Sequence, residues 1–152
     1  MKVRRYHIYS TEIICFLFVL LFSYAAISKL MDFELFRAQL GKSPLLTSIA
    51  GWVAWGIPLL ELIIALALIT PKFRLLACYG CLSLMSLFTM YIVIILNFTD
   101  DIPCACGGIL ETMGWQEHLI FNSIFIILAT IGILLHPNSF NQNNLTKNTV
   151  SR

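Results

Sequence analysis

The stretch Leu46–Thr70, with the sequence LTSIAGWVAWGIPLLELIIALALIT, contains one charged residue, Glu61. A membrane-spanning α-helix needs about 20 consecutive, mostly apolar residues, and this stretch is long enough. Three other runs have a similar length and character, at about residues 13–31, 73–98 and 118–136. The sequence therefore predicts an all-α polytopic membrane protein, built as a bundle of four transmembrane helices.

The overall composition supports this class. Of the 152 residues, 59% are hydrophobic and 12% are charged, whereas soluble domains average about 25% charged residues. The four runs leave almost no length for a soluble domain, so we expect one membrane domain over residues 1–136, surrounded by lipid. The polar, Asn-rich tail 137–152 has no periodicity and is expected to be disordered. The net charge of +2 gives no indication of nucleic-acid binding.

The first run resembles a cleavable signal peptide, because Lys2, Arg4 and Arg5 precede it. However, the apolar segment continues through Leu30 and reaches the length of a full span. This length favours retention of the segment as the first transmembrane helix.

The orientation follows from the distribution of basic residues, which are more frequent in cytoplasmic loops. One side of the four-span arrangement carries most of them: Lys2, Arg4, Arg5, Lys72, Arg74, Lys147 and Arg152. The other side carries Arg37 and Lys42, with Lys29 near the membrane edge, and the tryptophans Trp52, Trp55 and Trp115 lie at the outer ends of spans, where indole rings are favoured. We therefore expect a bacterial cytoplasmic membrane protein with both termini cytoplasmic and the loop before the fourth span in the periplasm.

A short amphipathic segment, Asp32–Leu40, follows the first span. Phe33, Phe36 and Leu40 recur at helical spacing with charged residues between them. This pattern predicts a helix lying in the outer membrane interface and ending at Gly41.

Glu61 lies near the middle of its span, where a carboxylate costs on the order of 3 kcal/mol on insertion scales. It must face the bundle or a wet cavity, or stay protonated. It is either a structural hydrogen-bonding group between helices or a proton or ligand site. Lys29 is the nearest basic candidate, but it lies about 10 Å above the centre of its own span and its stem can snorkel to water. A direct ion pair therefore requires helix tilt or a bridging water.

Three cysteines lie inside predicted spans. Cys78 and Cys81 match the spacing of a thioredoxin-like redox motif, but no alternating helix and strand pattern surrounds them. Together with Ala77, Gly80 and Ser83, Cys81 forms a small-residue surface suited to helix packing, and this interpretation is preferred. Cys15 is expected to be a buried apolar side chain.

The remaining two thiols, Cys104 and Cys106, lie in the outer loop segment PCACGG, residues 103–108. The two glycines allow close approach of a partner to the sulfurs. An outward loop meets an oxidising compartment in which disulfides form, and a bridge between residues two apart is strained and easily reduced. His118 could donate a proton or increase the thiolate fraction if the loop folds back over the fourth span; otherwise it is an interfacial histidine without a role.

The order of these features resembles the MauE branch of the MauE/DoxX-like membrane proteins. The resemblance rests on the small residues and Lys29 that end the first span, on Pro58 and Glu61 in the second, on the basic turn at Lys72, on Pro103–Gly108, and on the Gly-Trp-x-Glu-His start of the fourth span at Gly114–His118. It implies thiol–disulfide chemistry outside the cytoplasmic membrane, in which Cys104 and Cys106 exchange with a periplasmic thioredoxin-like protein. The resemblance also implies that this protein supports the maturation of an exported protein, as in methylamine utilisation. By analogy with the DoxX relatives it implies a quinone acceptor, for which Glu61 and Lys29 are the candidate proton or binding residues.

Two other functional classes remain open. The first is a carrier of a soft metal such as Cu(I) or mercury, because thiolates select such ions and Glu61 would mark the path. The second is a non-catalytic assembly or anchoring subunit with a structural disulfide. A structural zinc site is not expected, since two thiols and one histidine fall short of four ligands. The relay is preferred because the two-cysteine segment lies outside the membrane.

Overall fold

The computed structural model describes residues 2–42, 46–98 and 114–136, and this part of the chain is almost entirely helical. The elements are α1 (Lys2–Met31), α2 (Phe33–Lys42), α3 (Ala50–Ile69), α4 (Arg74–Phe98) and α5 (Trp115–Leu135), with a short 3-10 turn, η1 (Thr47–Ile49), leading into α3. The predicted all-α class is confirmed. The polar tail 137–152 lies outside the described residues.

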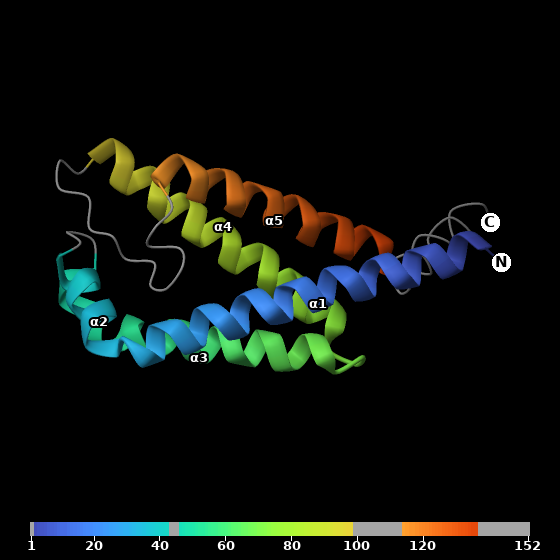
Figure 1. Cartoon of the computed structure of the whole chain (residues 1–152), viewed down its shortest axis with the longest axis horizontal. Helices are drawn as coiled ribbons and strands as arrows, with labels where there is room; N and C mark the ends of the chain where they lie inside the picture. Colours follow the sequence, from blue (N-terminus) through green and yellow to red (C-terminus); the bar gives the residue numbers. More distant parts are fainter. Residues whose placement is uncertain (1, 43–45, 99–113, 137–152) are drawn as a thin grey trace, which may run out of the picture.

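Four helices are long and apolar enough to cross a membrane. The candidate spans are Tyr9–Met31, Thr47–Ile69, Arg74–Ile94 and Gln116–Leu135. Consecutive spans run in opposite directions, and α2 lies at one end of the bundle, between the first two spans in the sequence (Figure 1). We call this end the α2 end. The predicted four-span architecture with one additional short helix is confirmed.

The four spans form two pairs. Helices α1 and α3 pack along each other, and so do α4 and α5. The two pairs meet near the turn between α3 and α4 and separate toward the α2 end (Figure 1). The bundle therefore has one closely packed half and one half in which the pairs diverge.

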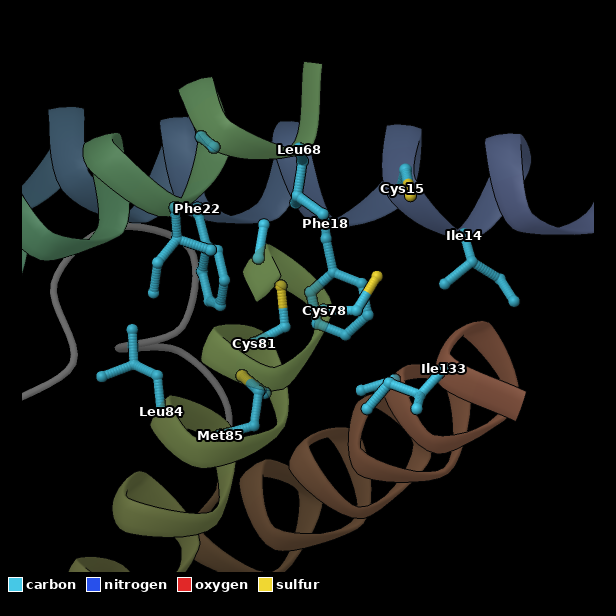
Figure 2. Close-up of a cluster of buried hydrophobic side chains, with 14 residues drawn as sticks. Ile14, Cys15, Phe18, Phe22, Leu68, Cys78, Cys81, Leu84, Met85 and Ile133 are labelled. Carbon is cyan, nitrogen blue, oxygen red and sulfur yellow. The ribbon is translucent and has the colours of Figure 1, made fainter. Parts of the chain in front are cut away.

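The closely packed half contains the main apolar core. Side chains of α1 and α3 point toward those of α4 and α5, as Figure 2 shows for Phe18, Leu68, Cys78 and Ile133. Phe18 packs edge to face against Phe125 of α5, with 5.3 Å between ring centroids. Because lipid is as apolar as these side chains, their close packing and not transfer from water holds the helices together.

The two phenylalanines of α1 that lie two residues apart provide a test. Phe18 is 2% exposed in the core, whereas Phe16 is 62% exposed on the lipid-facing side. Phe18→Ala leaves a cavity, and we expect it to lower the free energy of unfolding in mixed micelles by roughly 2–4 kcal/mol. Phe16→Ala, the matched control, should change it by less than about 0.5 kcal/mol. Equal effects of the two substitutions would contradict this assignment of the core.

Small residues bring the helices together. Ala26 of α1 and Ala54 of α3 have no exposed surface. On α4, Ala77 and Cys81 are buried, and a Cβ added at Gly80 would lie 3.4 Å from the Ile64 side chain. The predicted packing surface is confirmed for these α4 residues. It is wrong for Ser83, which is exposed because two residues beyond Cys81 the helix has turned to the opposite face.

Helix α2 packs on the bundle through its apolar face. Phe36 and Leu40 are buried against Ala50 and Ala54 of α3. The apolar face of α2 was therefore predicted correctly, although its central residues pack against the helix bundle. The expected end at Gly41 is wrong by one residue, since α2 continues to Lys42. Backbone hydrogen bonds at Asp32 join α1 to α2 with almost no loop between them.

Candidate functional site

A buried ion pair links α1 and α3. Lys29 Nζ lies 2.8 Å from Glu61 Oε1 and 3.2 Å from Glu61 Oε2. Lys29 is 7% exposed and Glu61 is 0% exposed. The expectation that Glu61 faces the bundle is therefore correct, and its partner is the lysine that sequence reasoning had named.

The expected direction of Lys29 is wrong. Its ammonium does not snorkel outward; it also donates a hydrogen bond to the Ala25 carbonyl oxygen, 3.3 Å away and one turn earlier in α1. Helical side chains lean toward the N-terminus of their helix, so the long lysine stem carries the charge back along α1 toward Glu61. The length and direction of the lysine side chain therefore allow Lys29 and Glu61 to form a direct ion pair, without a bridging water.

Two aromatic rings flank the lysine ammonium. The Phe36 ring centroid of α2 lies 6.0 Å from Lys29 Nζ, and that of Phe88 of α4 lies 5.9 Å away. Ring faces attract cations at about this distance, and the attraction grows when water is excluded. The charge is thus stabilised by side chains from α2, α3 and α4.

The ion pair lies on the wall of a cavity of about 330 Å³ in the half of the bundle where the helix pairs separate. All five α-helices contribute to its lining, which is mostly apolar. Phe36 and Leu40 of α2 close it at the α2 end. Its volume is within the range of small-molecule sites, which combine apolar walls with a few placed polar groups.

Polar groups of α5 face the same cavity. His118 and Asn122 lie one helical turn apart, and both are buried and line it. Asn122 is 2% exposed, and its amide nitrogen has no hydrogen-bond partner within the part of the chain that the structure describes. Tyr91 of α4 also contributes to the wall. His118 is therefore brought into one site with Lys29 and Glu61, as the sequence alone could not show.

The start of α5 is fixed by a local hydrogen bond. Glu117 Oε2 accepts a hydrogen bond of 2.7 Å from the Gly114 backbone N–H, and the His118 N–H donates to the Gly114 carbonyl oxygen. A Cβ at Gly114 would lie 3.4 Å from the same Glu117 oxygen. The Gly-Trp-x-Glu-His segment is thus explained as a helix start that positions His118.

Sequence reasoning missed Asn122, Phe36 and Phe88 as parts of this site. Asn122 carried a usable signal, because it is a lone amide within an apolar span and lies on the same helix face as His118. Phe36 and Phe88 carried none, since phenylalanine is common in membrane helices. Their role follows only from how the helices pack.

The cysteines separate into two groups. Cys104 and Cys106 lie outside the described residues, so their chemistry and their distance from His118 stay predictions. Cys15, Cys78 and Cys81 are free thiols buried in the main apolar core, and none of them lines the cavity. Interpreting Cys15 as an apolar core side chain, and Cys78 and Cys81 as packing residues, agrees with these positions.

Four apolar spans, a buried ion pair and an intramembrane cavity define this chain as a multi-pass membrane protein with a polar site inside its bundle. The chain belongs to the methylamine utilisation protein MauE family, whose family model matches residues 8–135. No curated protein and no solved structure gives a significant match. Family membership indicates a membrane protein of methylamine utilisation, and the matched region contains the ion pair, His118 and both loop cysteines.

Proposed function

We propose that this protein is a membrane thiol–disulfide redox protein that oxidises a periplasmic thioredoxin-like partner and so supports the maturation of an exported protein. Cys104 and Cys106 are the exchanging thiols, and the intramembrane cavity holds the electron acceptor. The observation that carries the proposal is the buried Lys29–Glu61 ion pair on the wall of an apolar cavity that also receives His118.

The cost of the ion pair supports a functional site. Removing two charges from water costs several kcal/mol per ion, and a well-packed apolar pair is often at least as stable. Apolar side chains at positions 29 and 61 would satisfy the packing at lower cost. A charged pair beside a cavity is therefore better explained by a function, such as orienting a polar ligand or holding a proton.

The loop cysteines would act in two exchange steps. A thiolate of the reduced partner attacks the Cys104–Cys106 disulfide, forming a mixed disulfide and releasing one loop thiolate. The second partner thiol then attacks the mixed disulfide, which leaves the partner oxidised and the loop with two thiols. Two electrons and two protons have then moved from the partner to Cys104 and Cys106.

The cavity fits a quinone as the acceptor. Its apolar walls suit a lipid-soluble ring, and its polar groups from α1, α3 and α5 offer both charge and hydrogen bonds. A bound quinone would accept the two electrons and two protons released when the loop thiols close to a disulfide again. Lys29, Glu61 and His118 are the residues of this chain that would hold and donate protons at the site.

The proposed topology follows from charge. Both termini and the α3–α4 turn, with Lys72 and Arg74, lie on the cytoplasmic side of a bacterial cytoplasmic membrane, because that end carries most basic residues. The α2 end then faces the periplasm, together with the loop that contains Cys104 and Cys106. Trp52 and Trp55 at the start of α3 are exposed toward lipid at this end, as expected for a membrane interface.

Trapping of mixed disulfides tests the exchange reaction. Cells producing wild type, Cys104→Ala or Cys106→Ala are quenched with acid, their thiols are blocked, and adducts are resolved without reductant. We expect one single variant to accumulate a mixed disulfide with a periplasmic protein, because its resolving thiol is missing. The double variant is the matched control and should form none. Absence of any adduct from both single variants would overturn the proposed exchange.

A soft-metal carrier gains no support from the described residues. Its thiol ligands would have to continue from the loop along a path through the bundle. Cys78 and Cys81 instead lie in the close-packed core, and no group of three or more metal-binding side chains is found in the described residues. Loss of metal uptake in both single variants, without a mixed disulfide, would favour the carrier.

A further inference from the structure

We infer that the cavity is a binding site for a lipid-soluble molecule whose head presents a carbonyl oxygen, that Asn122 donates a hydrogen bond to this oxygen, and that the molecule enters from the lipid between α3 and α4. The inference deepens the proposed function and rests on it for one point, the identification of this molecule as a quinone.

The first argument is the unpartnered donor. Asn122 is 2% exposed, it lines the cavity, and its amide nitrogen has no hydrogen-bond partner in the described chain. A buried polar group without a partner costs about 1–3 kcal/mol, and most such groups are satisfied in native proteins. An acceptor atom supplied by a ligand would remove this cost.

The second argument is the match between the polar groups and a neutral head. Among the described residues that line the cavity, Glu61 is the one that carries a formal negative charge, and its carboxylate is paired with Lys29 at 2.8 Å. The opposite charges of Lys29 and Glu61 largely cancel each other, so no ionic ligand is required to neutralise the cavity. An uncharged head with a carbonyl acceptor complements the free amide donor and the apolar walls.

The third argument is the direction of access. Leu60 of α3 and Leu87 of α4 line the cavity and are also 44% and 66% exposed on the outer surface of the bundle. These two helices belong to different pairs, which separate toward the α2 end (Figure 1). The cavity is therefore open at its side, where lipid surrounds the bundle, and a ligand that partitions into lipid would reach it.

Binding is measured on the full chain with both loop cysteines replaced by alanine, so that thiol chemistry does not contribute. The probe is a benzoquinone with a decyl tail, and the control compound is decylbenzene, which lacks both carbonyl oxygens. A ligand that binds the folded state raises the melting temperature according to its concentration and affinity. We expect the quinone to raise the melting temperature of the protein well above the effect of decylbenzene.

Asn122→Leu keeps a side chain branched at the same carbon but removes the hydrogen-bond donor. It should weaken quinone binding about tenfold, the value of one neutral hydrogen bond. Without ligand, the variant should melt at the wild-type temperature or above, because an unsatisfied polar group has been removed. This combination separates a binding role from a structural one, since a structural asparagine would lower the melting temperature when replaced.

Tryptophan substitutions test the entrance. Leu60→Trp and Leu87→Trp should reduce quinone binding, whereas Leu66→Trp should not. Leu66 is the matched control, because it is 66% exposed on α3 and does not line the cavity.

Three results would overturn the inference: equal stabilisation by decylbenzene, which indicates an acyl chain in the cavity; undiminished binding to Asn122→Leu; or equal effects of Leu60→Trp and Leu66→Trp. Quinone binding without any mixed disulfide would instead sustain the site and reject the proposed exchange.

Discussion

Glu61→Gln is expected to lower the free energy of unfolding by about 3–5 kcal/mol, because it leaves the Lys29 ammonium buried without its counter-ion. Lys29→Met should destabilise by a similar amount, since it leaves the carboxylate unpaired. The double variant Lys29→Met/Glu61→Gln should recover most of the loss, because neither charge is then buried without its counter-ion. Titration with denaturing detergent in mixed micelles measures all three values.

The double-mutant cycle decides whether the pair acts as one unit. Its interaction energy should be well above the value of about 0.5 kcal/mol that separates coupled from independent residues. Lys42→Met is the control, because it removes an exposed lysine at the end of α2. The expectation fails if Glu61→Gln is as stable as the wild type, or if the double variant is as unstable as the two single variants added together.

Labelling of intact cells with a membrane-impermeant maleimide, after mild reduction, is expected to modify Cys104 and Cys106 and no other thiol. Cys15, Cys78 and Cys81 are buried in the core and should react only after denaturation with detergent. The buried thiols therefore serve as an internal control in the same chain. The readout is all or none, because an impermeant reagent reaches one side of the membrane only.

A second variant fixes the opposite side. In the Cys104→Ala/Cys106→Ala background, Asn144→Cys places a thiol in the C-terminal tail, which should be labelled only after the membrane is permeabilised. Modification of Asn144→Cys in intact cells, or protection of both loop cysteines there, would reverse the proposed orientation and remove the basis for a periplasmic partner.

Much of the fold could be predicted from the sequence, because lipid imposes a strict rule on length and apolarity. The spans and the inward direction of Glu61 follow from this rule, whereas the buried face of α2 follows from the helical spacing of its apolar residues. Errors arose at the level of single side chains. Ser83 was assigned to the wrong face of α4, and Gly41 was expected to end α2 one residue early.

The site was predicted less completely, for a physical reason. Sequence identifies which polar residues are costly in a membrane, and so it pointed to Glu61 and Lys29. The sequence does not show in which direction a lysine side chain extends along its helix. Nor does it show that two helix pairs diverge and leave a cavity between them. His118 and Asn122 become parts of one site only through that divergence.

The Lys29–Glu61 pair joins α1 to α3, which are members of the same helix pair. Side chains of α1, α3, α4 and α5 share one apolar core, so apolar contacts form a large part of the interface between the two halves of the bundle. A change in the separation of the two helix pairs does not have to break this ion pair, because both of its partners lie in the same helix pair. The cavity can widen or narrow around a ligand while the charges beside it keep their mutual distance.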